Sequence, residues 1–217
     1  MLKFLLLLVV FLGLHDRSLA AQADYQVKVI DSAGNPVNNI AVFLTSTLKQ
    51  PNYQARNTII KQTEGAFSPY VNVVQKGKPV TFINEDEITH HIYSVAGKNR
   101  FSFKLHANKS LSKNEFSTTE EVAMGCNIHD WMTGYVLVVD TPIYGTTNSD
   151  GSIDFRNLRD GDYQVQIWHP KLKAIDKGII QDVKVKQGEV FEYTLKSVLD
   201  PIPKQDGLSD FEFLDEY

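Results

Sequence analysis

The chain has 217 residues, with 22 basic and 26 acidic side chains and a formal net charge of −4. Its Lys and Arg residues form no basic cluster, so nucleic acid is not expected as a partner. The sequence contains a single cysteine, Cys126, which excludes a disulfide bond within the chain.

The first twenty residues have the pattern of an export signal. Lys3 precedes an apolar run, Phe4 to Leu14, which is too short to cross a membrane as a helix. Small residues before Ala21 suit cleavage after Ala20. A retained N-terminal anchor is the alternative, which the early end of the apolar run at Gly13 disfavours. No later stretch is long and apolar enough to span a membrane, so we expect a periplasmic protein with residues 1–20 removed.

Residues 21–140 are predicted to form one β domain. Alternating apolar and polar residues separated by turn signals indicate strands at Tyr25–Val29, Ile40–Leu44, Tyr70–Val74, Pro79–Asn84, Ile92–Val95, Phe101–Leu105 and Gly134–Val139. The polar stretch from Lys49 to Gly65 shows no clear period and is predicted to be a long loop. No stretch of three helical turns has a convincing apolar stripe, and the spacing of the turns favours a sandwich.

A second β module is predicted over residues 141–198. Its strands are expected at Ser152–Phe155, Tyr163–Trp168, Ile179–Val185 and Val190–Leu195, between turns that contain Gly151, Gly161 and Gly188. A block of this size is small for an independent core, so we expect it to pack against the first domain.

The C-terminal tail is expected over residues 199–217. From Asp206 onward it has five carboxylates, three aromatic residues and no Lys or Arg. Acidity without periodicity predicts a disordered, solubilising end. The alternative is an electrostatic docking strip for a basic redox partner.

A cluster of soft metal ligands occurs just before the strand Gly134–Val139. Cys126, His129 and Met132 place a thiolate, an imidazole and a thioether at spacings of three residues, so one tight loop can wrap a metal from one side. Two His, one Cys and a distant axial Met make the site of a blue copper protein. The second imidazole must come from elsewhere, and the pair His90 and His91 at a strand end supplies it.

Several assignments within this cluster have alternatives. Neighbouring residues of a strand face opposite sides, so only one of His90 and His91 can be a ligand, and His90 is favoured. Met124 is a rival axial donor that ranks below Met132. Between two ligands, Asp130 is either a solvated carboxylate or a charge beside the site, and Trp131 is either a packing lid or an exposed contact for a partner.

The motif resembles the cupredoxins, and among them the amicyanin-like and plastocyanin-like members. These have Cys-x-x-His-x-x-Met before the last strand and a first His six residues after an Asn that ends a strand, as in Val80–Asn84 and His90. The resemblance covers about residues 22–140. The runs His90–Ser94 and Gly125–Asp130 are also similar to exported cupredoxin-like proteins of the methylamine-utilisation type. Those carry a C-terminal carboxypeptidase-regulatory-like β module, which residues 148–170 resemble.

This resemblance implies an all-β fold, with a Greek-key cupredoxin sandwich followed by a small Ig-like or transthyretin-like β-sandwich. It implies one type 1 copper, cycling between Cu²⁺ and Cu⁺, on His90, Cys126, His129 and Met132. The implied function is one-electron transfer with a partner protein such as a cytochrome or a dehydrogenase. Here His91 stands where many cupredoxins have an Asn that tethers the ligand loop.

Two other classes of function, a copper enzyme and a copper-binding module, differ from an electron carrier in what they require of the sequence. Copper enzymes need further copper ligands, but Gly125 and Asn127 flank Cys126 and the sequence has no His-x-His, so an enzyme is not expected. The alternative is a copper-binding, copper-delivering or structural β module without a role in electron transfer, which the presence of the second module favours.

Overall fold

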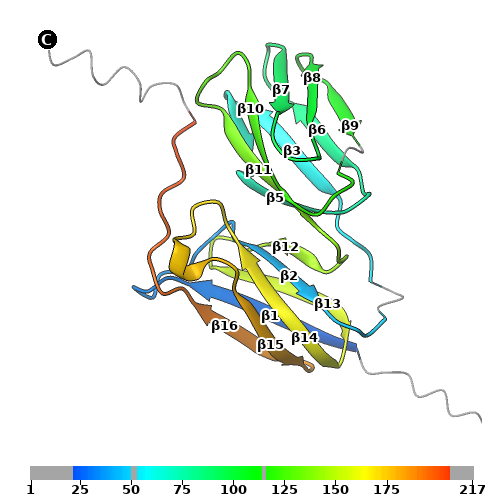
Figure 1. Ribbon diagram of the computed structural model, residues 1–217, viewed down its shortest axis with the longest axis vertical. Coiled ribbons are helices and arrows are strands. Elements are labelled where there is room, and N and C mark those ends of the chain that lie inside the picture. The colour runs from blue at the N-terminus through cyan, green and yellow to red at the C-terminus, as the bar shows by residue number, and fades with distance from the viewer. Residues whose placement is uncertain (1–21, 50–52, 114–115, 206–217) are drawn as a thin grey trace, which may run out of the picture.

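The computed structural model describes residues 22–49, 53–113 and 116–205. Strands dominate these residues, and their helical content is one turn of 3₁₀ helix at Ala174–Asp176. The strands form four sheets, which make two sandwiches stacked along the long axis of the molecule (Figure 1). The all-β prediction with two sandwich units is confirmed.

The upper sandwich in Figure 1 contains the strands from the middle of the chain. One sheet has the order β5-β11-β10-β7-β8 and the other the order β4-β3-β6-β9. Their bounds are β3 (Thr58–Thr63), β4 (Ala66–Ser68), β5 (Val71–Gln75), β6 (Val80–Asn84), β7 (His90–Ser94), β8 (Phe101–Leu105), β9 (Ser110–Lys113), β10 (Glu121–Cys126) and β11 (Thr133–Val139). The pairs β5–β11 and β3–β6 are parallel, and the other neighbours are antiparallel.

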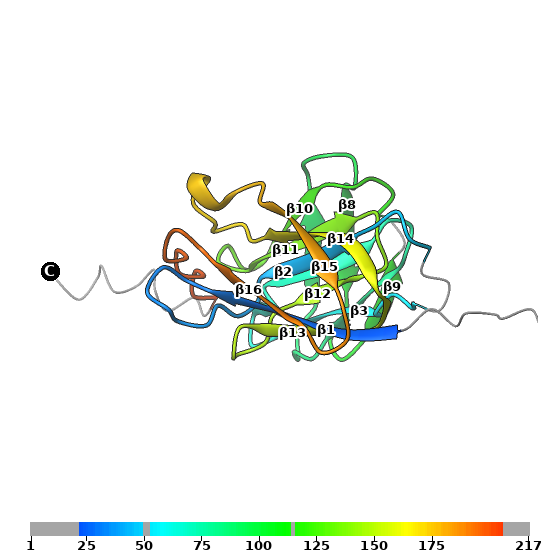
Figure 2. The same cartoon turned by 90° about the horizontal axis from the view of Figure 1, so that it is seen from below.

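The lower sandwich, which faces the viewer in Figure 2, combines strands from both ends of the chain. Its sheets have the orders β13-β1-β16 and β12-β2-β14-β15. Their bounds are β1 (Gln22–Ile30), β2 (Ala41–Thr45), β12 (Tyr144–Thr146), β13 (Ser152–Arg159), β14 (Gly161–Trp168), β15 (Ile180–Val185) and β16 (Val190–Thr194).

This pairing corrects the predicted division at residue 140. Strand β1 lies between β13 and β16, and β2 lies between β12 and β14, so the first two strands belong to the C-terminal module. The chain therefore starts in the lower sandwich, builds the upper one with β3 to β11, and returns. The alternation in β1 shows that one face is buried, but a buried face does not identify a pairing partner that lies more than a hundred residues away.

The predicted loop from Lys49 to Gly65 is also wrong, because it contains β3. Here the inward side chains include Thr58 and Gln62 beside Ile60, whereas Ile59 points outward and is 44% exposed. The usual polar and apolar pattern of a strand is therefore obscured. Strand β3 matters for the metal centre, because it ends at the turn that packs against His129.

The two sandwiches share an apolar junction, as expected from the small size of the second block. A cluster of buried side chains from both units forms it: Ala41, Tyr70, Val71, Val73, Leu137, Val139 and Tyr144. Polar bonds cross the same boundary, since Trp168 Nε1 donates to Glu121 Oε1 at 2.6 Å and the Tyr144 hydroxyl donates to the Arg56 carbonyl at 3.0 Å. The lower sandwich is therefore joined to the upper one by packing as well as by the chain.

Two predicted segments, the signal peptide at 1–20 and the acidic residues 206–217, lie outside the described residues. Within the part of the chain that the structure describes, no helix has the length and apolar character needed to cross a membrane.

Candidate metal centre

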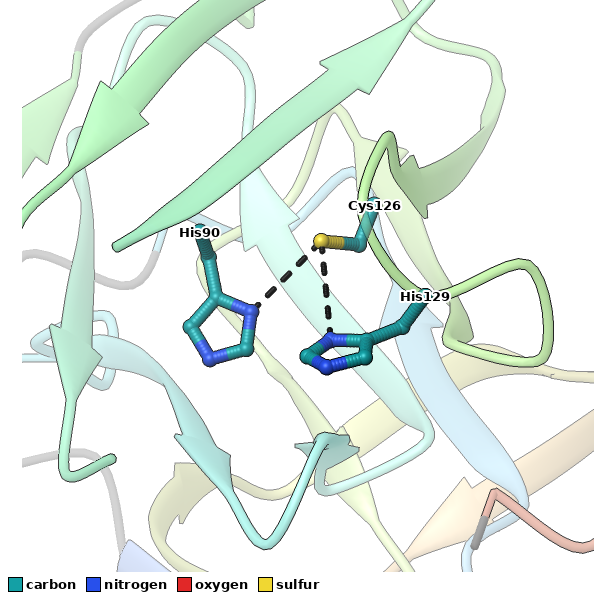
Figure 3. A group of neighbouring side chains, drawn as sticks. All are labelled: His90, Cys126 and His129. Atoms are coloured by element: carbon teal, nitrogen blue, oxygen red, sulfur yellow. Dashed lines mark hydrogen bonds between the residues drawn. The ribbon is translucent and has the colours of Figure 1, made fainter. Parts of the chain in front are cut away.

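Three of the four predicted ligands meet at one end of the upper sandwich (Figure 3). Cys126 Sγ lies 3.5 Å from His90 Nδ1 and 4.0 Å from His129 Nδ1. One potential ligand atom from each residue lies within 4.8 Å of the other two. His90 is completely buried, Cys126 is 3% exposed, and His129 is half-buried. The group is therefore enclosed on the protein side and reaches solvent at the His129 side.

Strand pairing explains why these residues meet. Cys126 is the last residue of β10 and pairs with Ile92 of β7, so His90 at the start of β7 lies at the same end of the sheet. His129 lies in the loop between β10 and β11. That loop closes tightly, because Met132 N donates to the His129 carbonyl at 3.0 Å.

His91 points away from this group. Its Nε2 lies 2.8 Å from the Ser102 hydroxyl on the neighbouring strand β8, while His90 faces the interior. The exposed His106 makes a contact of 3.2 Å with the Thr89 hydroxyl. The geometry thus brings His90, and neither His91 nor His106, to Cys126.

Asn84 anchors the loop that leads to His90. Its amide nitrogen donates to the carbonyls of Ile88 at 2.7 Å and Leu105 at 3.0 Å, and its oxygen accepts from Asp86 N at 2.9 Å. The side chain is 1% exposed, and buried bonds of this kind hold a loop in one arrangement. Asn84 therefore tethers the loop from six residues before His90.

Asp86 is a site residue that the sequence did not predict. Its Oδ2 lies 2.7 Å from His90 Nε2, the ring nitrogen that faces away from Cys126. It also accepts from the backbone N–H groups of Glu64 at 2.6 Å and Gly65 at 3.2 Å. Burial alone would raise the pKa of Asp86, but the hydrogen bonds from Gly65, His90 and Glu64 outweigh it and keep that pKa below its usual range. A carboxylate so placed fixes the ring of His90 and leaves Nδ1 free to act as a ligand.

The turn between β3 and β4, which bonds Asp86, also packs against the ligand loop. A Cβ on Gly65 would lie 3.6 Å from Trp131 Nε1 and 3.9 Å from His129 Cε1, so this turn packs closely on both rings. The His129 and Trp131 rings lie 5.0 Å apart, which supports the packing role for Trp131 over an exposed contact. Asp130, which lies between His129 and Trp131 in the sequence, is exposed to solvent.

His129 is electrostatically suited to bind a metal as a neutral ligand. Burial and the nearby His90 lower the pKa of His129, against the opposing effect of the Asp86 carboxylate. A ligating imidazole must be unprotonated, so a lowered pKa favours metal binding at neutral pH.

Both methionines near the group are buried. Met132 is 1% exposed and Met124 is 3% exposed, and both belong to the apolar core that contains Cys126. The Met124 methyl carbon Cε lies 3.2 Å from the position that a Cβ on Gly134 would occupy. Burial alone does not choose between the two thioethers, and Met132 remains the predicted axial ligand on its spacing from Cys126.

No protein-family model matches the chain, and no curated protein matches it. Among solved structures, an oxidised amicyanin variant is 21% identical over 38% of this chain and 82% of its own, with a TM-score of 0.36. A purple cupredoxin from Nitrosopumilus maritimus is 22% identical over 38% of this chain and all of its own, with a TM-score of 0.33. A copper-containing nitrite reductase from Thermus scotoductus SA-01 is 20% identical over 52% of this chain and 28% of its own, with a TM-score of 0.37. These likenesses are partial, so the support for a metal centre comes from the geometry of the residues described above.

Proposed function

We propose that the protein carries single electrons on one type 1 copper ion held by His90, Cys126, His129 and Met132. One observation carries this proposal: a cysteine sulfur and two imidazole nitrogens converge at a buried strand end with a methionine on the same loop. Thiolate, imidazole and thioether together are the donor set of blue copper sites.

The distances between the donors fit a metal between them. Metal bonds of about 2.3 Å to a cysteine sulfur and about 2.0 Å to an imidazole nitrogen, the lengths usual for zinc, would separate the two donor atoms by roughly 3.7 Å at an angle of about 120°. The separations of Cys126 Sγ from His90 Nδ1 and His129 Nδ1 are 3.5 and 4.0 Å. Small side-chain shifts therefore suffice to complete a three-donor site.

When bound, copper supplies a one-electron exchange between two oxidation states. The chain holds the donors so that little needs to move during that exchange: Asp86 fixes His90, Asn84 fixes the loop before it, and the β3–β4 turn packs on His129. Among His90, Cys126 and His129, His129 is the one side chain that is only half-buried, so we propose it as the route for electrons to a docked partner. A redox protein such as a cytochrome or a dehydrogenase, in the periplasm, is the partner class we propose.

A non-enzymatic role agrees with the ligands available. Among the described residues, His90, Cys126 and His129 form the one cluster of His, Cys, Asp or Glu side chains able to hold a metal. Gly125 and Asn127 beside Cys126 offer no second imidazole for a copper cluster. We therefore propose a single redox centre without a substrate site.

Copper delivery is the second candidate, and the large lower sandwich favours it because a simple carrier needs one domain. The two roles differ in reversibility. A carrier passes through repeated oxidation and reduction with its metal retained, whereas a donor releases Cu(I) to a competing chelator.

Visible absorption tests the proposal directly. Cu(II) added to the protein from residue 21 onward is expected to give an intense thiolate charge-transfer band at one equivalent. Cys126→Ser is the matched control, which should lose the band and keep the β-rich circular dichroism spectrum of a folded protein. A colourless wild-type protein, or a Cys126→Ser variant that keeps the colour, would show that the site is assigned wrongly.

A further inference from the structure

The last described residues form a strap that crosses from the lower sandwich to the upper one. We define this C-terminal strap as residues 195–205, the segment in orange to red that rises along the left of Figure 1. Its start is fixed in the lower unit, where Leu195 is buried and its N–H donates to the Ile30 carbonyl at 2.8 Å. Further along the strap, Ile202 packs against the apolar junction of the two sandwiches. Pro201 and Pro203 flank Ile202 in the sequence, and their fixed φ angles limit the flexibility of the strap.

Gln205 ends the strap with three hydrogen bonds to the upper sandwich. Its Oε1 accepts from Thr133 N at 3.1 Å and from Phe67 N at 3.2 Å, and its Nε2 donates to the Phe67 carbonyl at 3.4 Å. Phe67 lies on β4 and Thr133 begins β11, and these strands belong to different sheets of the sandwich. One amide therefore joins the two sheets across their seam.

The seam lies beside the proposed copper ligands. Thr133 directly follows Met132, whose N–H donates to the His129 carbonyl. Phe67 belongs to the hairpin whose turn, at Glu64 and Gly65, is bonded to Asp86 and packs on His129. The two strands that Gln205 joins are thus the two that directly follow the ligand loop and the turn that packs on His129.

We propose that Gln205 is a positioning residue for the metal centre: the strap from the lower sandwich fixes β4 against β11 and so fixes Met132 and the turn over His129. The copper part of this inference rests on the proposed function. It assigns the second sandwich a role, since the strap is anchored there through Leu195 and through the bond from Lys196 N to Asp176 Oδ1 at 2.8 Å.

The bonds themselves are tested without copper. Amide hydrogen exchange in the metal-free protein is compared between wild type and Gln205→Leu, and between chains ending at Gln205 and at Lys204. Exchange of the Phe67 and Thr133 N–H groups should be about two- to tenfold faster when the Gln205 side chain is absent, the factor expected for one ordinary hydrogen bond. Equal exchange in both pairs overturns the inference, whatever the protein does with copper.

The positioning role is tested on the copper-loaded protein. Gln205→Leu should shift the reduction potential and the intensity ratio of the thiolate charge-transfer bands, whereas the chain ending at Gln205 should keep the wild-type ratio. Faster exchange with an unchanged ratio and potential would make Gln205 merely structural and refute the positioning role. If wild-type protein gives no thiolate band, the proposed function fails, and the exchange experiment still decides whether the strap joins the two sheets.

Discussion

Acid should lower the free energy of unfolding of this protein through His169, a histidine far in sequence from the proposed metal ligands. His169 lies at the end of β14, is 1% exposed, and stacks obliquely on Tyr70 of the upper sandwich with 6.1 Å between ring centroids. Its Nδ1 accepts from Lys171 N at 3.1 Å, and its buried Nε2 has no hydrogen-bond partner among the described residues. Burial, with a smaller contribution from the charge of Lys171, lowers the pKa of His169 to about 4.

The size of the effect follows from linkage. The unfolded chain binds a proton at His169 near the ordinary value of 6.5, whereas the folded chain resists protonation until about pH 4. Between these values the unfolded state holds more protons, so the contribution to stability is present above pH 6.5 and is lost as the pH falls. Relative to pH 7, the free energy of unfolding falls by about 2 kcal/mol at pH 5 and by about 3 kcal/mol at pH 4.

Urea unfolding of the metal-free protein at pH 7 and pH 5 measures this loss. His169→Asn is the comparison, because its amide oxygen can replace Nδ1 as the acceptor for Lys171 N and it does not titrate. The other histidines are common to both proteins and cancel in the difference. Hydrogen bonds from Asn35 lower the pKa of Asp31, so carboxylates of this kind change stability at lower pH than the range from pH 5 to pH 7. If both proteins lose equal stability between pH 7 and pH 5, the reasoning about His169 is refuted.

Three further predictions concern the upper sandwich. His90→Ala should weaken Cu(II) binding much more than His91→Ala, because His91 is turned toward Ser102, and a titration with the reverse order would move the ligand. Asp86→Asn should lower copper affinity by about 10- to 100-fold in a chelator competition, since the carboxylate orients His90; unchanged affinity would show that this bond is dispensable. Gln62→Leu should raise the melting temperature of the metal-free protein by about 3 °C, because the fully buried Gln62 amide has no partner for either atom among the described residues. A lower melting temperature would show that this amide is bonded.

Local patterns predicted most strands, and what they missed depends on distant contacts. Alternation in Tyr25–Val29 identified a strand with one buried face, and the structure confirms that strand as part of β1. Nothing local indicates that this strand pairs with β13 on one side and β16 on the other, which the return of the chain brings beside it. Strand β3 was not predicted because its buried positions include the polar residues Thr58 and Gln62, so the alternation of polar and apolar residues that marks a strand is missing.

The ligand loop was predictable because its donors are close in sequence. Cys126 and His129 are three residues apart, and the strand ending at Asn84 indicated where the second imidazole lies. Asp86 was missed because an acidic residue in a polar loop is usually solvated. Its role appears only in the fold, where the N–H of Gly65, in the turn between β3 and β4, donates a hydrogen bond to it. Gln205 gives no sequence signal, since its amide bonds backbone groups of two residues, Phe67 and Thr133, that lie far from it in the chain.

The position of Gln205 also decides how a docking role for the acidic tail must be tested. Residues 206–217 carry five carboxylates and no cation, and they follow a residue bonded beside the ligand loop. A cut after Pro203 would remove both the negative charge and the Gln205 bonds, so a slower reaction would have two causes. The chain ending at Gln205 removes the acidic tail and keeps the Gln205 side chain. If the tail docks a basic cytochrome, this shortened chain will react more slowly with that partner at low salt and keep its copper spectrum. The difference should shrink as salt rises, because screening acts over about 10 Å at 0.1 M. Equal rates at low salt would exclude the tail from docking with that partner.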